Sequence, residues 1–316
     1  MSGLYQKYTK LIGADHLFER SAENVQVTGQ PASDLIRDKI LEGKPLMIAR
    51  FGSTELNCML NYYFINQGFL TNVKNIVSGI PYFLKLKENI MDHMKMSSGF
   101  FPATKEYIMR FCKMSLEDLP EIDILGSWMK QERYLYKYFK YDHVRVRLGD
   151  ITPLRHTHPW SIALEGKKVL IVHPFEDTII SQYKRRTLLF KDERMLPAFE
   201  LKTLKAVQSI VGTKTAFNDW FEALDYMKNK IEAIDFDIAI LGCGAYGMPL
   251  AAHIKRMGKQ AIHFGGETQT LFGIKGKRWE DAIYNYHNKF YNDYWVRPSN
   301  NEKPQDANKM ENGAYW

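Results

Sequence analysis

Residues 237–257, DIAILGCGAYGMPLAAHIKRM, decide the fold, because a short apolar run is followed there by three glycines and an amphipathic run. The run Asp237–Leu241 has no alternating polar face, which is typical of a strand covered on both faces of a parallel sheet. Residues 242–247 match G-x-G-x-x-G, and residues 247–257 have helical periodicity. The order strand, glycine turn, helix predicts one βα unit of a Rossmann-like sheet.

The same alternation of short apolar runs and longer amphipathic runs extends along the chain, with Lys168–His173 as a second buried strand. We expect further strands at 45–50, 122–126, 143–147, 199–203 and 260–264, and helices at 32–42, 54–66, 82–95, 104–114, 130–139, 176–189 and 217–233. This pattern predicts an α/β fold: a mostly parallel, Rossmann-like sheet with helices on both faces.

The same alternation of apolar and amphipathic runs predicts the domain organisation. We expect a single α/β domain over residues 1–297 and a polar, flexible tail over residues 298–316, since the tail has too little apolar surface to offset its ordering entropy. Tyr315 and Trp316 are the two tail residues able to dock.

The net charge and the distribution of basic residues limit the kinds of ligand or macromolecule that the chain is expected to bind. A formal net charge of +7 indicates either a generally basic surface or attraction to phosphate. The basic residues are scattered among acidic ones and show no zinc-finger spacing, which argues against nucleic acid as a partner. Three distant cysteines, no secretory signal and no apolar run of about 20 residues predict a cytoplasmic protein, with association to the inner face of the membrane as an option.

The first candidate site is the stretch Arg50-Phe51-Gly52-Ser53-Thr54-Glu55, where a strand ends and a helix begins. In the structural interpretation, Ser53 or Thr54 caps the helix and Glu55 complements the helix dipole. In the functional interpretation, the helix N-terminus receives a phosphate with Arg50 as its charge-assisted partner, and Glu55 acts as a ribose acceptor, metal ligand or base.

The second candidate site is the glycine turn, with Gly242, Gly244, Tyr246 and Gly247 as donor-binding residues. Glycines in this position let the backbone approach a phosphate, and they also allow tight packing of helix on strand without any ligand. A dinucleotide site would place an acidic residue at the end of the next strand, but that strand ends at His263.

Further candidates follow other predicted strands. His173 ends a strand and is either a site residue or a hydrogen-bonded structural histidine. Lys184 and Arg185 belong to a basic run that is either a solvated helix face or a clamp for a diphosphate. Lys275 lies in a glycine-flexed basic loop suited to folding over a ligand. His156 and His158 lack a third metal ligand at a recognisable spacing.

Ligands of parallel sheets bind at the carboxyl ends of the strands. Arg50, His173, Gly242 and His263 all follow predicted strands, so we expect them to meet at one edge of the sheet. No G-x-S-x-G elbow and no Walker Gly-Lys-Ser/Thr occurs in the sequence, which argues against hydrolases of that type and P-loop enzymes.

The motifs Ala49-Arg50-Phe51-Gly52-x-x-Glu55, Leu241-Gly-x-Gly with Leu250-Ala251, and Gly258-Lys-Gln-Ala-Ile-His263 resemble those of the GT-D fold bacterial glycosyltransferases. The resemblance spans residues 45–275. It implies a transferase that uses a nucleotide sugar, with UDP as the expected nucleotide, to extend a surface glycan or a lipid-linked acceptor. Glu55 would then be the general base or an acceptor for a donor hydroxyl.

The family's acidic D-x-E motif corresponds to Ser53, Thr54 and Glu55, so the first carboxylate is replaced by Ser53. This replacement argues against a bound Mn²⁺ or Mg²⁺, because one carboxylate is a poor site for a hard cation; Glu55 would be the ligand if a metal binds. Without a metal, helix N-termini and Arg50, Lys184, Arg185 or Lys275 must neutralise the leaving diphosphate.

Two other functions remain open at the level of sequence. One is an oxidoreductase that holds NAD(P) or FAD at the glycine turn, and the other is a non-catalytic protein that binds a nucleotide sugar.

Overall fold

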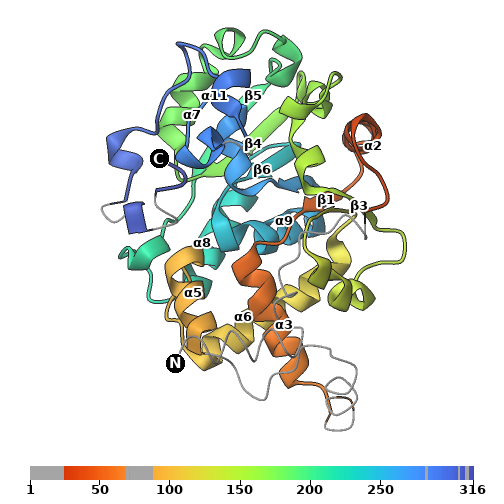
Figure 1. The fold of residues 1–316 in the computed structure, drawn as a ribbon, viewed down its shortest axis with the longest axis vertical. Coiled ribbons are helices and arrows are strands. Elements are labelled where there is room, and N and C mark those ends of the chain that lie inside the picture. The colour runs from red at the N-terminus through yellow and green to blue at the C-terminus, as the bar shows by residue number, and fades with distance from the viewer. Residues whose placement is uncertain (1–24, 69–70, 72–87, 282–283, 305–306, 310–312) are drawn as a thin grey trace.

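The computed structural model describes residues 25–68, 71, 88–281, 284–304, 307–309 and 313–316. Within these residues seven strands form one sheet in the order β3-β2-β1-β7-β6-β4-β5, and every strand pair is parallel (Figure 1). The strands are β1 (Leu46–Ala49), β2 (Ile124–Ser127), β3 (Val144–Arg147), β4 (Lys168–His173), β5 (Glu200–Lys205), β6 (Ile238–Leu241) and β7 (Gln260–His263). The expected parallel α/β fold is confirmed.

Helices occupy most of the connections between strands. The α-helices are α2 (Gln30–Leu41), α3 (Ser53–Ile65), α5 (Glu88–Ser98), α6 (Lys105–Asp118), α7 (Glu176–Tyr183), α8 (Trp220–Glu232), α9 (Gly247–Arg256), α10 (Thr268–Leu271) and α11 (Tyr286–Lys289). Residues 82–87 of the helix expected at 82–95 lie outside the described part of the chain.

Short 3₁₀ helices fill many of the remaining connections. They are η2 (Leu119–Glu121), η3 (Lys130–Tyr138), η4 (Leu148–Ile151), η5 (Pro153–Arg155), η6 (Trp160–Leu164), η7 (Arg186–Leu188), η8 (Glu193–Met195), η9 (Ile210–Gly212), η10 (Gly244–Tyr246), η11 (Gly265–Glu267), η12 (Lys277–Glu280), η13 (Asn300–Glu302) and η14 (Ala307–Lys309).

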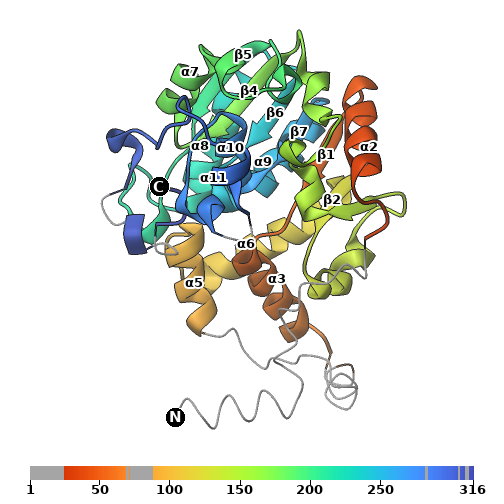
Figure 2. The same ribbon diagram turned by 45° about the horizontal axis from the view of Figure 1, so that its top comes forward.

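Alternate side chains of the strands enter two separate cores, one on each face of the sheet. In β6, Ala239 and Leu241 join the core formed with α3, α6, α8 and α9, whereas Ile238 and Ile240 join the core formed with α2 and α7. Figure 2 shows α2 and α7 on one side of the sheet and the group of α3, α5 and α6 on the other. Burial on both faces explains why the inner strands β1 and β6 are apolar throughout, whereas the edge strands β3 and β5 carry charged residues.

Two predicted helices differ from the observed ones. The helix expected at 176–189 ends at Tyr183, because the backbone of Arg185 leaves the helical region (φ −118°, ψ 29°) before η7 begins. The segment expected as an ordinary helix at 130–139 is the 3₁₀ helix η3. Its buried residues Glu132 and Leu135 are three apart, which matches the three-residue repeat of a 3₁₀ helix.

The expectation of a flexible tail over residues 298–316 is wrong for the residues that the structure describes there. Ala307 and Ala314 are buried, and Glu302 is only 3% exposed. The Glu302 carboxylate accepts hydrogen bonds from the backbone N–H of Asp177 (2.8 Å) and of Thr178 (3.3 Å), and from the Thr178 hydroxyl. A carboxylate far along the chain therefore caps the N-terminus of α7, a contact that composition does not reveal.

Replacing Glu302 by alanine is expected to lower the free energy of unfolding by about 1–3 kcal/mol. The substitution leaves two backbone donors, one of them buried, and one hydroxyl of α7 without their acceptor. Urea denaturation measures the effect, and Glu165→Ala, at an exposed position, is the control. Equal stability of the two variants would show that the contact contributes nothing.

None of the helices in the described residues has the length and apolar character needed to cross a lipid bilayer.

Candidate functional site

A cavity of about 830 Å³ lies at the carboxyl edge of the sheet. Its volume is within the range of small-molecule sites. Residues at or just after the ends of all seven strands line it: Arg50, Ser127, Arg147, His173, Val207, Gly242 and His263. Arg50, His173, Gly242 and His263 thus meet at one edge, as their positions after predicted strands led us to expect.

The strand order places a topological switch point inside this cavity. Neighbouring strands β4 and β6 continue in opposite directions, because the chain passes from β4 to β5 on one side and from β6 to β7 on the other. His173 ends β4 and Gly242 follows β6, so these two residues flank the crevice between them. Open α/β sheets bind their ligands in this kind of crevice.

Arg50 lies directly after β1 and is half-buried in the cavity wall. Its guanidinium runs beside Gly265, where a Cβ atom would be 3.5 Å from Arg50 Nε. Among the described residues, none accepts a hydrogen bond from Arg50 or forms an ion pair with it. A half-buried guanidinium without an acceptor is suited to bind an anionic ligand through charge-assisted hydrogen bonds.

Glu55 lies in the first turn of α3, and its carboxylate folds back over Gly52 at the helix N-cap. A Cβ atom at position 52 would collide with this carboxylate, so a larger residue there would displace the Glu55 side chain. No described residue donates a hydrogen bond to Glu55. Gly52, Ser53 and Thr54 also line the cavity. The expected capping of α3 by Ser53 or Thr54 is wrong, because Gly52 is the N-cap and no side chain caps the helix.

The three glycines of the turn after β6 have different structural roles. Gly244 has a positive φ of 57° and open space where a Cβ would be, so its backbone faces the cavity. Gly242 and Gly247 instead make room for side chains, because a Cβ would clash with His173 and Thr268 at the first position and with His263 at the second. Gly242 and Gly244 line the cavity, but Gly247 is not among the lining residues.

Tyr246 and Cys243 complete this turn and are largely buried. The Tyr246 ring stacks on Trp220 (centroids 4.7 Å apart, planes 6° apart), and its hydroxyl lies 3.3 Å from Ser209 Oγ. Tyr246 is therefore held mainly by the core, with only an edge on the cavity. Burial raises the pKa of the Cys243 thiol to about 12, which makes it a poor nucleophile.

Two buried histidines in the cavity wall are neutral at physiological pH. Burial lowers the pKa of His173 to about 3, and burial together with the charge of Arg50 lowers the pKa of His263 to about 3. His173 Nδ1 accepts a hydrogen bond from the backbone N–H of Phe175 (2.9 Å), which fixes the ring. The positive charge of the cavity must therefore come from arginines.

Three arginines that the sequence analysis did not select also line the cavity: Arg147, Arg155 and Arg278. With Arg50 they face three carboxylates (Glu55, Glu267 and Asp281). Burial raises the pKa of Glu267 above its ordinary value, although Arg155 and the hydrogen bonds to this carboxylate act in the opposite direction. The position of Arg147 at the end of the run HVRVR, equivalent to that of Arg50, was a usable signal; Arg155 and Arg278 depend on tertiary packing.

Glu267 is connected to Arg155 through Tyr286. Arg155 hydrogen-bonds to the Tyr286 side chain, and the Tyr286 hydroxyl donates to Glu267 Oε2 (3.1 Å). Next to Arg155, a Cβ on Gly149 would be only 2.7 Å from Arg155 Nη1, so the guanidinium packs directly on the backbone of Gly149. These contacts give the Arg155 guanidinium a defined place at the cavity.

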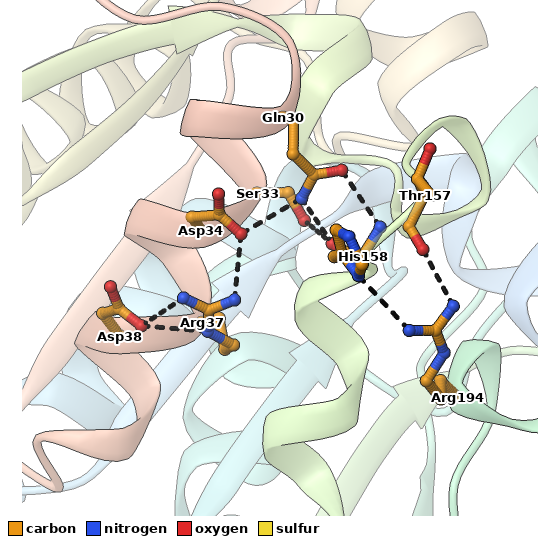
Figure 3. Close-up of polar contacts among 8 residues, drawn as sticks. All are labelled: Gln30, Ser33, Asp34, Arg37, Asp38, Thr157, His158 and Arg194. Atoms are coloured by element: carbon orange, nitrogen blue, oxygen red, sulfur yellow. Dashed lines mark hydrogen bonds and ion pairs between the residues drawn. The ribbon is translucent and has the colours of Figure 1, made fainter.

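A polar network holds the loop that carries Arg155 (Figure 3). Gln30 on α2 donates to the carbonyl of His158 (2.7 Å) and accepts from the backbone N–H of the same residue (3.0 Å). Ser33 donates to that carbonyl too (2.9 Å), and Arg194 donates to the carbonyl of Thr157 (2.9 Å). The loop between β3 and β4 is thereby fixed to α2 and η8.

Lys184, Arg185 and Lys275, expected as donor-binding residues, are not among those that line the cavity. Lys184 is exposed at the end of α7, and Arg185 donates to Gln182 Oε1 (2.7 Å). Lys275 Nζ lies 5.4 Å from the centroid of the Tyr291 ring. The structure therefore does not bring these three cations together with Arg50, because α7 ends at Tyr183 and turns the basic run away from the strand ends.

The described residues do not fit a metal ion. No three of their His, Cys, Asp or Glu side chains gather as a metal site would require. In the stretch Ser53–Glu55, Glu55 supplies the single carboxylate, and His156 and His158 are bonded to Asp150 O (2.9 Å) and Arg194 respectively. We therefore derive no step that uses a metal.

Comparisons with known proteins give matches only among solved structures. No family model and no curated protein matches the sequence. One similar structure is described as the selenomethionine-substituted domain of unknown function 1792; it has 13% identity and a TM-score of 0.37, covering 91% of this chain and 97% of that one. Another, described as showing that this domain has a distinct glycosyltransferase fold, has 14% identity and a TM-score of 0.36, covering 86% and 95%.

Proposed function

We propose that this chain transfers a sugar from a nucleotide sugar, with UDP as the expected nucleotide, to a hydroxyl group of a glycan or lipid-linked acceptor. One observation carries the proposal: Arg50 and Glu55, each without a described partner, line one cavity at the carboxyl edge of the sheet. A cation to hold a diphosphate and a carboxylate to take a proton are the two groups that this reaction needs.

In the proposed reaction, the acceptor hydroxyl oxygen forms a bond to the anomeric carbon of the donor sugar. The bond between that carbon and the diphosphate oxygen breaks, and its electron pair leaves with the diphosphate. Glu55 takes the proton of the acceptor hydroxyl, which makes it the general base.

The leaving diphosphate gains negative charge as this bond breaks. Arg50, Arg147 and Arg155 line the cavity and are the proposed stabilising cations. The guanidinium of Arg155 is already held by Tyr286, so little reorganisation of this group is needed when the charge develops. The backbone of Gly244, which faces open space, lets a phosphate approach the turn before α9.

A thermal-shift screen tests the proposal. The ligands are UDP-, GDP-, CMP- and dTDP-sugars with and without Mn²⁺, and NADH is the comparison ligand. We expect one sugar nucleotide to stabilise the chain by about 2–4 kcal/mol at saturation without Mn²⁺, and NADH to have no effect. Stabilisation by NADH alone would support an oxidoreductase and contradict the proposal. Binding of a sugar nucleotide without any turnover, tested by donor hydrolysis, would indicate a non-catalytic binding protein.

A further inference from the structure

Four aromatic residues from the last part of the chain form one side of the cavity. We refer to Trp279, Tyr284, Tyr315 and Trp316 as the aromatic wall; all four line the cavity. Trp279 is fully buried, whereas Tyr284, Tyr315 and Trp316 are half-buried and present part of their surface to it.

Several contacts fix Tyr315 against the rim of the sheet. Gln269 Nε2 donates to the carbonyl of Tyr315 (3.1 Å), and Arg278 Nη1 donates to its hydroxyl (3.0 Å). The backbone N–H of Arg278 donates to the carbonyl of Ala314 (2.9 Å). A Cβ on Gly266 would collide with the Tyr315 ring, so the ring packs directly on the backbone after β7.

Trp316 extends the wall toward the switch point between β4 and β6. Its ring centroid lies 6.0 Å from that of Phe175, which follows β4, and 5.9 Å from that of Tyr315. The two contacts are edge-to-face, with interplanar angles of 68° and 90°. Trp316 therefore lies against the turn after β4, and Tyr315 beside it lies against the turn after β7.

We propose that Trp316 stacks on the nucleobase of the nucleotide while the arginines hold its phosphates. This inference rests on the proposed function. A nucleotide combines a flat base with a charged diphosphate, and the cavity has the same two parts: an aromatic wall and a group of arginines. A base presents a π-face whatever its identity, so stacking gives affinity, and base–aromatic stacking is among the stronger single contacts that nucleotides make.

Isothermal titration of the intact chain with two probes tests this inference. The probes are the tightest-binding nucleoside diphosphate among UDP, GDP and dTDP, and inorganic pyrophosphate, which has no base. Trp316→Ala is expected to weaken nucleoside diphosphate binding about 5- to 150-fold and to change pyrophosphate binding less than twofold. Trp316→Phe, which keeps an aromatic ring, should restore most of the loss. Tyr294→Ala, at an exposed aromatic outside the cavity, is the matched control.

Each outcome separates the inference from the proposed function. Equal losses for both probes would show that Trp316 only supports the local fold, and no loss for either would show that the base binds elsewhere; both results overturn the inference. Loss of affinity only for the complete sugar nucleotide would place the sugar on the wall and overturn it too. If the wild-type chain binds neither probe, the proposed function fails instead.

Discussion

Replacing Arg50 by alanine is expected to lower kcat/KM for the sugar nucleotide about 100- to 1000-fold. Hydrogen bonds to charged groups contribute about 1.5–3 kcal/mol each, and a guanidinium offers two in parallel to a phosphate. No described residue accepts a hydrogen bond from Arg50, so the substitution removes only its packing beside Gly265 and its attraction to the buried Glu132 carboxylate. The free energy of unfolding should therefore change by no more than about 1 kcal/mol. Steady-state kinetics and urea denaturation measure the two quantities.

Two further variants make the Arg50 result specific. Arg50→Lys keeps the charge but loses the bidentate geometry, so it should recover only part of the activity. Arg37→Ala is the matched control, because this arginine on α2 pairs with Asp34 and Asp38 outside the cavity (Figure 3). Wild-type kinetics for Arg50→Ala would mean that the cavity does not hold the phosphates at this residue.

Replacing Glu55 by glutamine should lower kcat about 100- to 10,000-fold, while the Kd for the sugar nucleotide changes by less than about threefold. A general base contributes roughly this factor, and glutamine keeps the size and polarity of the side chain but cannot accept the proton. Single-turnover kinetics separate the chemical step from binding, and calorimetry measures the Kd.

The chain contains a matched control for Glu55. Glu222 also lies in the first turn of a helix, α8, but outside the cavity, and it accepts a hydrogen bond from the backbone N–H of Asn218. Glu222→Gln should keep full activity. If Glu55→Gln retains wild-type kcat, Glu55 is not the base, and Glu267 becomes the carboxylate to test next.

The fold could be predicted from the sequence because its strands carry the information locally. The runs Val169–Val172 and Ile238–Leu241 are apolar throughout, which is what burial on both faces of a parallel sheet requires. The residues directly after the strands, Arg50, His173 and Gly242, were predicted to meet for the same reason, since the carboxyl ends of parallel strands share one edge.

The parts of the site that the sequence did not reveal depend on contacts between distant segments. Arg155 reaches the cavity because Gln30 and Ser33, more than a hundred residues earlier, hold its loop. Trp316 lies in a segment whose polar composition suggested a free tail, yet it packs on Phe175. Neither contact is signalled by the residues next to it in the sequence. The expectation for Lys184 and Arg185 failed for a related reason, because a run of basic residues does not show where its helix ends.

The residues of the two cores are largely distinct from the residues that follow the strands and line the cavity. This separation affects how the substrate specificity of the fold can change. Strand residues such as Ala239 and Ile240 are buried in the two cores, so substituting them is expected to destabilise the whole fold. Of the positions one step past a strand, Arg50 and Pro174 belong to neither core, whereas Gly242 and Phe264 are still needed for packing. Exchanging only positions of the first kind would therefore change the substrate on an unchanged framework, and a mutant library confined to them should retain a high proportion of folded members.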